Sequence, residues 1–326
     1  LHRSRGLGDV YKRQVWPGEV QAVWHLDRDP AGSSPQLDDS SVRNHDGRSS
    51  GSMTNADLLP ALVGNGVDFD GSDDVLESDP FELAGTSALT VSAWVRLDAL
   101  ATDSVVVAKA DDASTRVFEL AVTSGVTLRA RLLLGGSTVE AQAGSVGLAT
   151  WHHVAASWDS STLRIYVDGV EQTNVPATGS LGSDPAMPVT IGNLASGDRP
   201  VDGRIDEVRI ETAVRSNDWL SAVVANHQTP ITFHAIGGVE TGTWLSQGTW
   251  TYRKPVVADA DLIDADVADF ALLVQLTDPE LQAEALASGD DIVFTAADGL
   301  TRLDHVIETY DGGTGALSAW VAIPLL

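Results

Sequence analysis

The sequence predicts an all-β fold, an antiparallel β-sandwich, and three observations support this prediction. Short runs alternate between apolar and polar residues, as Leu163, Ile165 and Val167 do with their neighbours, and a period of two is typical of strands with one buried face. Turn signals recur at short intervals, as expected for a sandwich. One segment, Ser216–His227, has the apolar spacing of a helix, and Ser216 is its expected N-cap.

Length and charge narrow the classes of function. A chain of 326 residues has room for about two domains. Hydrophobic residues make up 43% and charged residues 20%, which favours a packed core. The formal charge of −26 repels phosphate backbones, so we expect no nucleic-acid partner. No apolar run approaches the ~20 residues of a transmembrane helix, so we expect no membrane insertion. The absence of cysteine excludes disulfide and thiol chemistry.

The first residues differ in kind from the rest. When Ser4–Gln14 is back-translated, it resembles a transposon-end adaptor used in DNA library preparation. We therefore interpret residues 1–14 as an artefact and exclude them from the fold. The chain is then expected to be a bacterial metagenomic fragment whose native N-terminus is missing.

The segment Trp151–Gln172 is the strongest motif. Asp159-Ser160-Ser161 predicts a turn between two alternating runs, and Asp168-Gly169 predicts a second, tight turn. With Thr150 in front, the phrase TWHHVAASWDSSTLRIYVDGVEQ closely resembles the central hairpin of laminin-G-like, concanavalin A-type jelly-roll modules of bacterial surface proteins. GVDFDGSDD at 66–74 and GRIDEVRI at 203–210 resemble further phrases of that family.

This resemblance implies a concanavalin A-like jelly-roll domain over residues 15–237. The alternation predicts its other strands in chain order, which are Val15–His25, Leu89–Leu97, Val105–Lys109, Phe118–Thr123, Val126–Leu134, Val189–Gly192 and Gly203–Ile210.

A second pattern follows in the C-terminal part. Residues 238–247 are rich in Gly and Thr and are expected to be a linker. Residues 248–326 are expected to form a second, C-terminally truncated β-domain. Phrases such as TWTYRKPVV and DDIVFTAADG resemble an uncharacterised bacterial surface family, the domain of unknown function 2341. That family accompanies laminin-G-like modules and precedes proton-channel subunits of the MotA/TolQ/ExbB type.

The laminin-G-like resemblance also implies a structural calcium ion. Asp206 stands where relatives hold this ion, and Asp27, Asp39 and Asn44 match the opposite side of that site. Carboxylate and carbonyl oxygens are the ligands that calcium takes. The alternative is that these residues are ordinary surface groups of an acidic chain.

Aromatic residues of the predicted strands suggest a ligand surface. Trp94, Trp158 and Tyr166 could stack on sugar rings, and the alternative is that they pack in the core. The adjacent His152 and His153 point to opposite faces of a strand, so we expect a structural role rather than a shared metal ion.

Two sequence patterns bear on catalysis. The E-x-D-x-x-E spacing of jelly-roll laminarinases is met once, by residues 77–82 (ESDPFE), but we expect no pair of catalytic carboxylates there. Residues 47–51 fit the G-x-S-x-G pattern, but we expect a flexible loop there, without the flanking strand and helix that a nucleophile elbow needs.

The expected function is therefore a non-enzymatic binding or adhesion module. It would be extracellular, at the cell surface or periplasmic, and its partner would be a glycan or a surface protein. The alternatives are a glycan-active hydrolase of the jelly-roll class and the periplasmic sensor part of a MotA/TolQ/ExbB-type proton-channel protein.

Overall fold

A computed structural model describes residues 15–110, 116–244, 250–263 and 265–326. The segment interpreted as adaptor, residues 1–14, lies outside the described residues. Contacts divide the chain into two compact units. One is Gly18–Leu220, and the other comprises Ser221–Leu326 together with the chain up to Pro17. We describe the two units separately.

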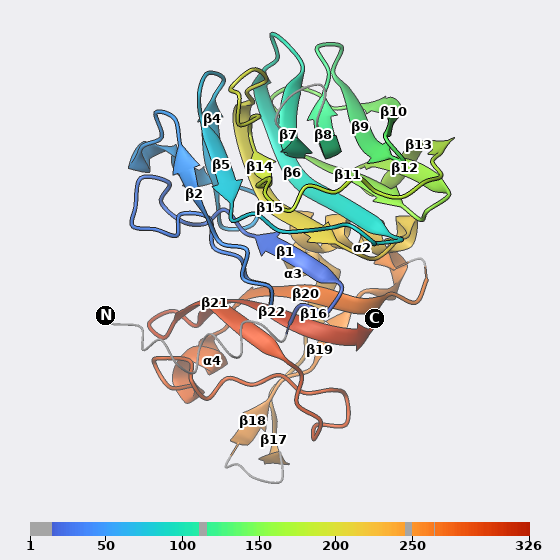
Figure 1. Ribbon diagram of the computed structural model, residues 1–326. Helices are drawn as coiled ribbons and strands as arrows, with labels where there is room; N and C mark the ends of the chain where they lie inside the picture. Colours follow the sequence, from blue (N-terminus) through green and yellow to red (C-terminus); the bar gives the residue numbers. More distant parts are fainter. Residues whose placement is uncertain (1–14, 111–115, 245–249, 264) are drawn as a thin grey trace. The chain divides into compact units, whose positions relative to one another are not determined.

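The unit Gly18–Leu220 is an antiparallel β-sandwich of two large sheets, as predicted (Figure 1). We call the sheet that contains the predicted central hairpin sheet A. Its strands in spatial order are β13 (Val170–Pro176), β12 (Thr162–Val167), β11 (His152–Trp158), β6 (Leu89–Ala99), β15 (Asp202–Glu211), β4 (Asn65–Asp70) and β3 (Leu58–Pro60), and β1 (Val20–Trp24) also pairs with β15.

The second layer, sheet B, has seven strands. In spatial order they are β10 (Ser137–Ser145), β9 (Thr127–Leu134), β8 (Arg116–Val122), β7 (Ser104–Ala110), β14 (Thr190–Ile191), β5 (Val75–Ser78) and β2 (Gly47–Ser50). The short 3-10 helix η1 (Asn55–Asp57) follows β2. Residues 47–51 were expected to be a loop, but Gly47–Ser50 pairs with β5 as an edge strand, and the Ser49 hydroxyl donates to the carbonyl oxygen of Pro30.

The core lies between the two sheets and follows the predicted alternation. In sheet A, Val91, Ala93 and Val95 of β6 belong to it, and in sheet B Phe118 and Leu120 of β8 do. All five side chains are buried because each strand turns every second residue toward the facing sheet.

Both predicted turns of the central hairpin are present. Asp168 and Gly169 have φ angles of 52° and 78°, the left-handed backbone that a two-residue hairpin turn of this kind requires. One Asp168 oxygen accepts from the backbone N–H of His153 at 2.9 Å, and the other lies 2.7 Å from Nδ1 of His152. At the other turn, Asp159 accepts from the backbone N–H of Thr162 at 2.8 Å.

The second unit contains a three-stranded antiparallel sheet in the order β20 (Ala268–Thr277), β22 (Ala316–Leu325), β21 (His305–Asp311). Its smaller elements are β16 (His234–Ile236), which pairs with β19 (Val256–Ala258), and β17 (Glu240–Trp244), which pairs with β18 (Trp250–Arg253), together with α3 (Pro230–Phe233), η2 (Ala260–Leu262) and α4 (Pro279–Glu284). Strand β17 thus lies in the segment expected to be a linker.

The predicted helix is present as α2 (Asn217–Gln228), and the Ser216 hydroxyl accepts from the backbone N–H of Trp219 at 3.2 Å, as an N-cap does. Within the second unit, the Asn226 side chain bonds both the N–H and the carbonyl of Leu273 in β20. Trp16 packs against Trp320 with ring centroids 5.6 Å apart, which explains why Val15–Pro17 groups with this unit and not with the sandwich. No helix among the described residues is long and apolar enough to cross a membrane.

His153 should make the fold sensitive to acid. Burial, and then the charge of Arg209, lower the pKa of its imidazole to about 3. As the pH falls from 6.5 towards 3, the unfolded chain binds a proton that the folded chain does not bind, so the free energy of unfolding decreases by about 1.4 kcal/mol per pH unit. Urea unfolding at pH 7, 5 and 4 should show a smaller acid loss in His153→Gln than in the wild type. Equal losses in both proteins would contradict this prediction.

Candidate functional site

The outer face of sheet B carries charged side chains in the middle of the sheet. In β8, Phe118 and Leu120 point into the core, so Glu119 between them points outward. In β9 the same alternation turns Arg129 and Arg131 outward. Glu119 pairs with Arg131 in the strand register, and Arg131 pairs in turn with Glu140 of β10.

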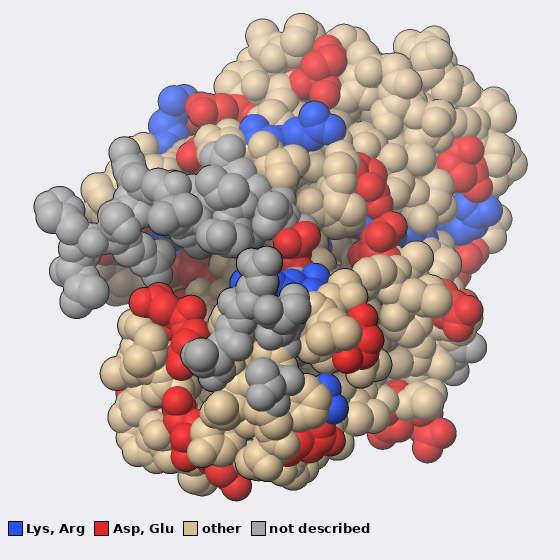
Figure 2. All heavy atoms as spheres, turned by 90° about the horizontal axis from the view of Figure 1, so that it is seen from below, with Lys and Arg blue, Asp and Glu red and all other residues tan. Residues whose placement is uncertain are grey.

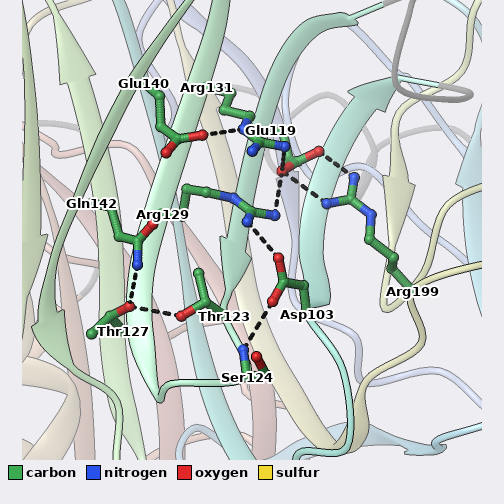
Figure 3. Close-up of polar contacts among 10 residues, drawn as sticks. All are labelled: Asp103, Glu119, Thr123, Ser124, Thr127, Arg129, Arg131, Glu140, Gln142 and Arg199. Atoms are coloured by element: carbon green, nitrogen blue, oxygen red, sulfur yellow. Dashed lines mark hydrogen bonds and ion pairs between the residues drawn. The ribbon is translucent and has the colours of Figure 1, made fainter.

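Glu119 is the centre of this arrangement (Figure 3). Its side chain has 0% exposure, and three arginine side chains converge on its carboxylate. Arg199 donates to both oxygens, one of these bonds measuring 3.1 Å. Arg129 donates at 3.2 Å, and Nη1 of Arg131 lies 3.6 Å away. A buried carboxylate needs such compensation, because isolated burial of a charge is very costly.

Two further carboxylates complete the charge balance. Asp103 binds Arg129 and accepts from the backbone N–H of Ser124 at 2.9 Å, and Glu140 binds Nε of Arg131 at 2.5 Å. We call this set the sheet B cluster. It consists of Asp103, Glu119, Arg129, Arg131, Glu140 and Arg199, three acidic and three basic side chains.

A loop after β14 brings Arg199 onto the sheet. Leu194 of this loop packs against small residues on the outer face, among them Ala108 and Ala121. The Asn193 side chain accepts from the backbone N–H of Arg199 at 3.1 Å, and the Arg199 carbonyl accepts from Val105 at 3.0 Å. The position of the guanidinium is therefore fixed by the loop backbone as well as by Glu119.

Towards the edge of the sheet, the polar surface continues into β10. Gln142 donates from its side-chain amide to the hydroxyl of Thr127 at 2.8 Å, and that hydroxyl lies 2.7 Å from the hydroxyl of Thr123. Exposure rises in the same direction, from 0% for the Glu119 side chain to 21% for Arg131 and 39% for Glu140. The outer strands thus offer donors and acceptors, among them Arg131, which contacts the buried Glu119, and Glu140, which contacts Arg131.

The residues predicted to bind calcium are not brought together. Asp39 is buried, and its two oxygens already accept from three backbone N–H groups, of Val23, Ser41 and His45, at 2.7–3.0 Å, and from the Ser41 hydroxyl at 2.8 Å. Asp27 is exposed. These contacts make Asp39 the organiser of its own loop, so it has no oxygen to spare for an ion.

Asp206 differs from the other predicted ligands because one of its oxygens remains available. Its side chain is completely buried, and Oδ2 accepts from the N–H of Val63 at 2.9 Å while Oδ1 has no hydrogen-bond partner among the described residues. Burial, followed by the charge of Glu207, raises the pKa of Asp206 well above its ordinary value. Asn44 is exposed and bonds Asp46 at 3.3 Å. Among the described residues, Asp27, Asp39 and Asp206 do not come together as a group of metal-ligating oxygens, so the predicted set does not fit a calcium ion.

Sequence reasoning passed over another group of carboxylates. Among the described residues, Asp70, Asp73 and Asp74 are the three acidic side chains that offer one oxygen each within 4.8 Å of one another. The sequence feature that could have indicated this group is the density of Asp residues in the turn DGSDD between two strands.

The predicted sugar platform is not available on the surface. Trp94, Trp158 and Tyr166 are exposed by only 0%, 1% and 2%, so none has a ring face open to solvent. Trp158 belongs to the core between the sheets and donates from its indole N–H to the Ala177 carbonyl at 2.7 Å. A buried ring cannot stack on a sugar, and these three residues are structural.

His152 also has a structural role, as expected. Its Nδ1 lies 2.7 Å from Asp168, and its Nε2 accepts from the backbone N–H of Gly147 at 3.1 Å. With both ring nitrogens engaged, His152 has no free nitrogen for a metal ion.

The family comparison agrees with this fold. The family described as the concanavalin A-like lectin/glucanases superfamily matches residues 70–221. No curated protein matches the chain. The comparisons thus support the sandwich, and they do not test the second resemblance, to the domain of unknown function 2341.

Solved structures with similar folds are distant in sequence. The binding domain of Paraclostridial Mosquitocidal Protein 1 is 10% identical with a TM-score of 0.51, over 89% of this chain and 71% of that chain. Domain 4 of AbnA, an extracellular arabinanase from Geobacillus stearothermophilus in complex with arabinotriose, is 17% identical with a TM-score of 0.49, over 63% of this chain and 98% of that chain. Trypanosoma rangeli sialidase is 15% identical with a TM-score of 0.47, over 66% of this chain and 33% of the sialidase.

The sheet B cluster predicts unequal costs for two similar substitutions. Glu119→Gln leaves three arginines around a neutral buried group, and breaking a buried pair of this kind costs about 3–5 kcal/mol. Glu140→Gln removes a half-exposed partner, and such surface pairs contribute about 0–1 kcal/mol. In urea unfolding at pH 7, the free energy of unfolding should be lower for Glu119→Gln than for Glu140→Gln by at least about 2 kcal/mol. A similar loss in both would show that Glu119 does not organise the cluster.

Proposed function

We propose that the chain is a non-enzymatic binding module that holds a glycan on the outer face of sheet B, at strands β9 and β10. The contact residues in this proposal are Thr127, Arg131, Glu140 and Gln142. The observation that carries it is the graded cluster, in which the fully buried Glu119 contacts Arg131, Arg131 binds Glu140, and side-chain exposure rises towards the sheet edge.

Sugar hydroxyl groups suit such a surface because each hydroxyl can donate and accept a hydrogen bond. Arg131 and Gln142 supply planar donors, and Glu140 supplies acceptors, all on adjacent strands. Side chains that are already oriented lose less conformational freedom when a ligand binds. Because three acidic side chains balance three basic ones, we favour a neutral glycan as the ligand.

The surface chemistry supports a glycan over a protein partner. None of the large hydrophobic side chains exposed among the described residues lies on β8, β9 or β10. Protein interfaces usually centre on buried apolar or aromatic anchors. Figure 2 shows acidic side chains spread over the face in view and basic side chains in fewer places, in keeping with the formal charge of −26.

The carboxylates of the cluster support a role without catalysis. Glycoside hydrolysis needs an accessible nucleophile and a carboxylic acid with a raised pKa. Glu119 has no exposed side-chain surface. Burial tends to raise the pKa of Asp103, but the hydrogen bonds from Ser124 and Arg129 outweigh it and lower the value overall. An extracellular, cell-surface or periplasmic location remains part of the proposal, and it rests on the laminin-G-like resemblance.

The test is retention by soluble neutral polysaccharides. Affinity electrophoresis of the full chain in gels with arabinan, β-glucan or galactan should show retardation by at least one polymer. The double variant Glu140→Ala/Gln142→Ala should weaken that retardation at least about tenfold, which corresponds to about 1.4 kcal/mol. Its melting temperature should stay close to that of the wild type, because surface substitutions of this kind cost little.

A matched control exists on sheet A. Glu171 and Asn174 lie on the edge strand β13 and bond each other at 2.7 Å. Glu171→Ala/Asn174→Ala should leave retention unchanged. Equal weakening in both double variants, or full retention in Glu140→Ala/Gln142→Ala, would refute the assignment of the face. Released reducing sugar would refute the non-enzymatic role.

A further inference from the structure

The turn between β4 and β5 lies outside the sheet B cluster and has its own chemistry. It runs from Asp70 to Asp74 and links sheet A to sheet B. One oxygen from each of Asp70, Asp73 and Asp74 lies within 4.8 Å of the other two. Asp70 and Asp73 are exposed, so solvent ions can reach the group.

Each of the three carboxylates uses one oxygen to hold the turn. Oδ1 of Asp70 accepts from the N–H of Ser72 at 2.8 Å, and Oδ1 of Asp73 accepts from the Ser52 hydroxyl at 2.8 Å. Oδ2 of Asp74 accepts from the N–H of Asp70 at 3.1 Å. These bonds fix the carboxylates and leave the second oxygen of each for a ligand.

Asp74 supplies an independent reason to expect a ligand. The residue is only 2% exposed, and its Oδ1 has no hydrogen-bond partner among the described residues. A buried carboxylate oxygen without a partner loses its hydration without compensation. A cation would supply the missing partner.

A fourth carboxylate adds to the negative charge. Asp202 is the register partner of Asp70 across β4 and β15, and like charges in that position repel. Its Oδ2 atom would lie 3.2 Å from a Cβ added at Gly71, which places the carboxylate beside the turn. Within the described part of the chain, none of these four carboxylates forms an ion pair with a Lys, Arg or His.

The spacing and the ligand type favour calcium. Calcium binds oxygen at about 2.3–2.6 Å, so two opposite ligands are at most about 5 Å apart, whereas opposite ligands of magnesium are about 4 Å apart. Three carboxylate oxygens within 4.8 Å of one another are compatible with the larger ion, and water can complete its shell on the exposed side.

We infer that Asp70, Asp73 and Asp74 bind one calcium ion, with Asp202 close enough to bind it through water. The ion would compensate the repulsion of the four carboxylates and clamp the turn that joins the two sheets. This site is separate from Asp206, and the inference does not depend on glycan binding.

The test is calorimetric titration of the full chain with CaCl₂, after removal of metal with a chelator, and a parallel titration with MgCl₂ at equal ionic strength. We expect a Kd for calcium of about 0.1–1 mM, in the range of extracellular modules, and weaker binding of magnesium. Asp74→Asn should weaken calcium binding at least about tenfold. Asp70→Asn should do the same, and it decides the outcome if Asp74→Asn does not fold, because Asp70 is exposed.

Two controls distinguish this site from other carboxylates. Asp298 accepts from the N–H of Leu300 at 2.8 Å, the same turn bond as that of Asp70, and Asp298→Asn should bind calcium like the wild type. Asp206→Asn should also bind calcium with the same Kd as the wild type. Absence of calcium binding in the wild type, binding that survives Asp70→Asn, or binding that is lost in Asp206→Asn would each overturn the inference. The Glu140→Ala/Gln142→Ala variant should bind calcium normally, so the failure of one proposal leaves the other open.

Discussion

The packing of the two sheets against each other is the interaction on which the sandwich depends. Each strand turns alternate side chains into the shared core, where Trp24, Phe69 and Trp158 are almost completely buried. This leaves the opposite residues of each strand for other roles. On sheet B they form a charge-balanced cluster, and on sheet A they include Trp94 and His153, whose rings pack edge to face at 5.2 Å.

Local patterns were sufficient to predict much of the fold. Alternation located strands such as β6 and β9, and Asp168-Gly169 located the hairpin turn, because both signals arise from neighbouring residues. Strand β2 was missed because its four residues, GRSS, have no apolar alternation and are half-buried or exposed. An edge strand of this kind is held by backbone bonds to β5, which leave no pattern in its side chains.

The site residues were harder to predict because they depend on contacts between distant segments. Period two shows that two residues share a face, but it does not show whether that face is open to solvent. The alternation therefore leaves Trp158 as a candidate for a sugar platform, although its side chain lies in the core. The carboxylate oxygens of Asp39 accept hydrogen bonds from the backbone N–H groups of Val23 and His45. The residue type alone does not reveal these hydrogen bonds. Glu119 did leave a signal, since RVFELAV and TLRARLLL place opposite charges among apolar residues on strands that pair. No sequence pattern indicated that Arg199, which lies 80 residues after Glu119, would bind its carboxylate.

The position of β15 in sheet A has a consequence for the order of folding. This strand pairs with β1, β4 and β6, all of which precede it in the chain, β1 starting at Val20 and β15 ending at Glu211. During synthesis from the N-terminus, these three strands are made long before their common partner, and until it arrives they have unpaired edges. Contacts over such long stretches of chain also make folding slow. A nascent sandwich therefore needs nearly its whole length before sheet A can close, and the interval before closure is when it is most exposed to association with other chains.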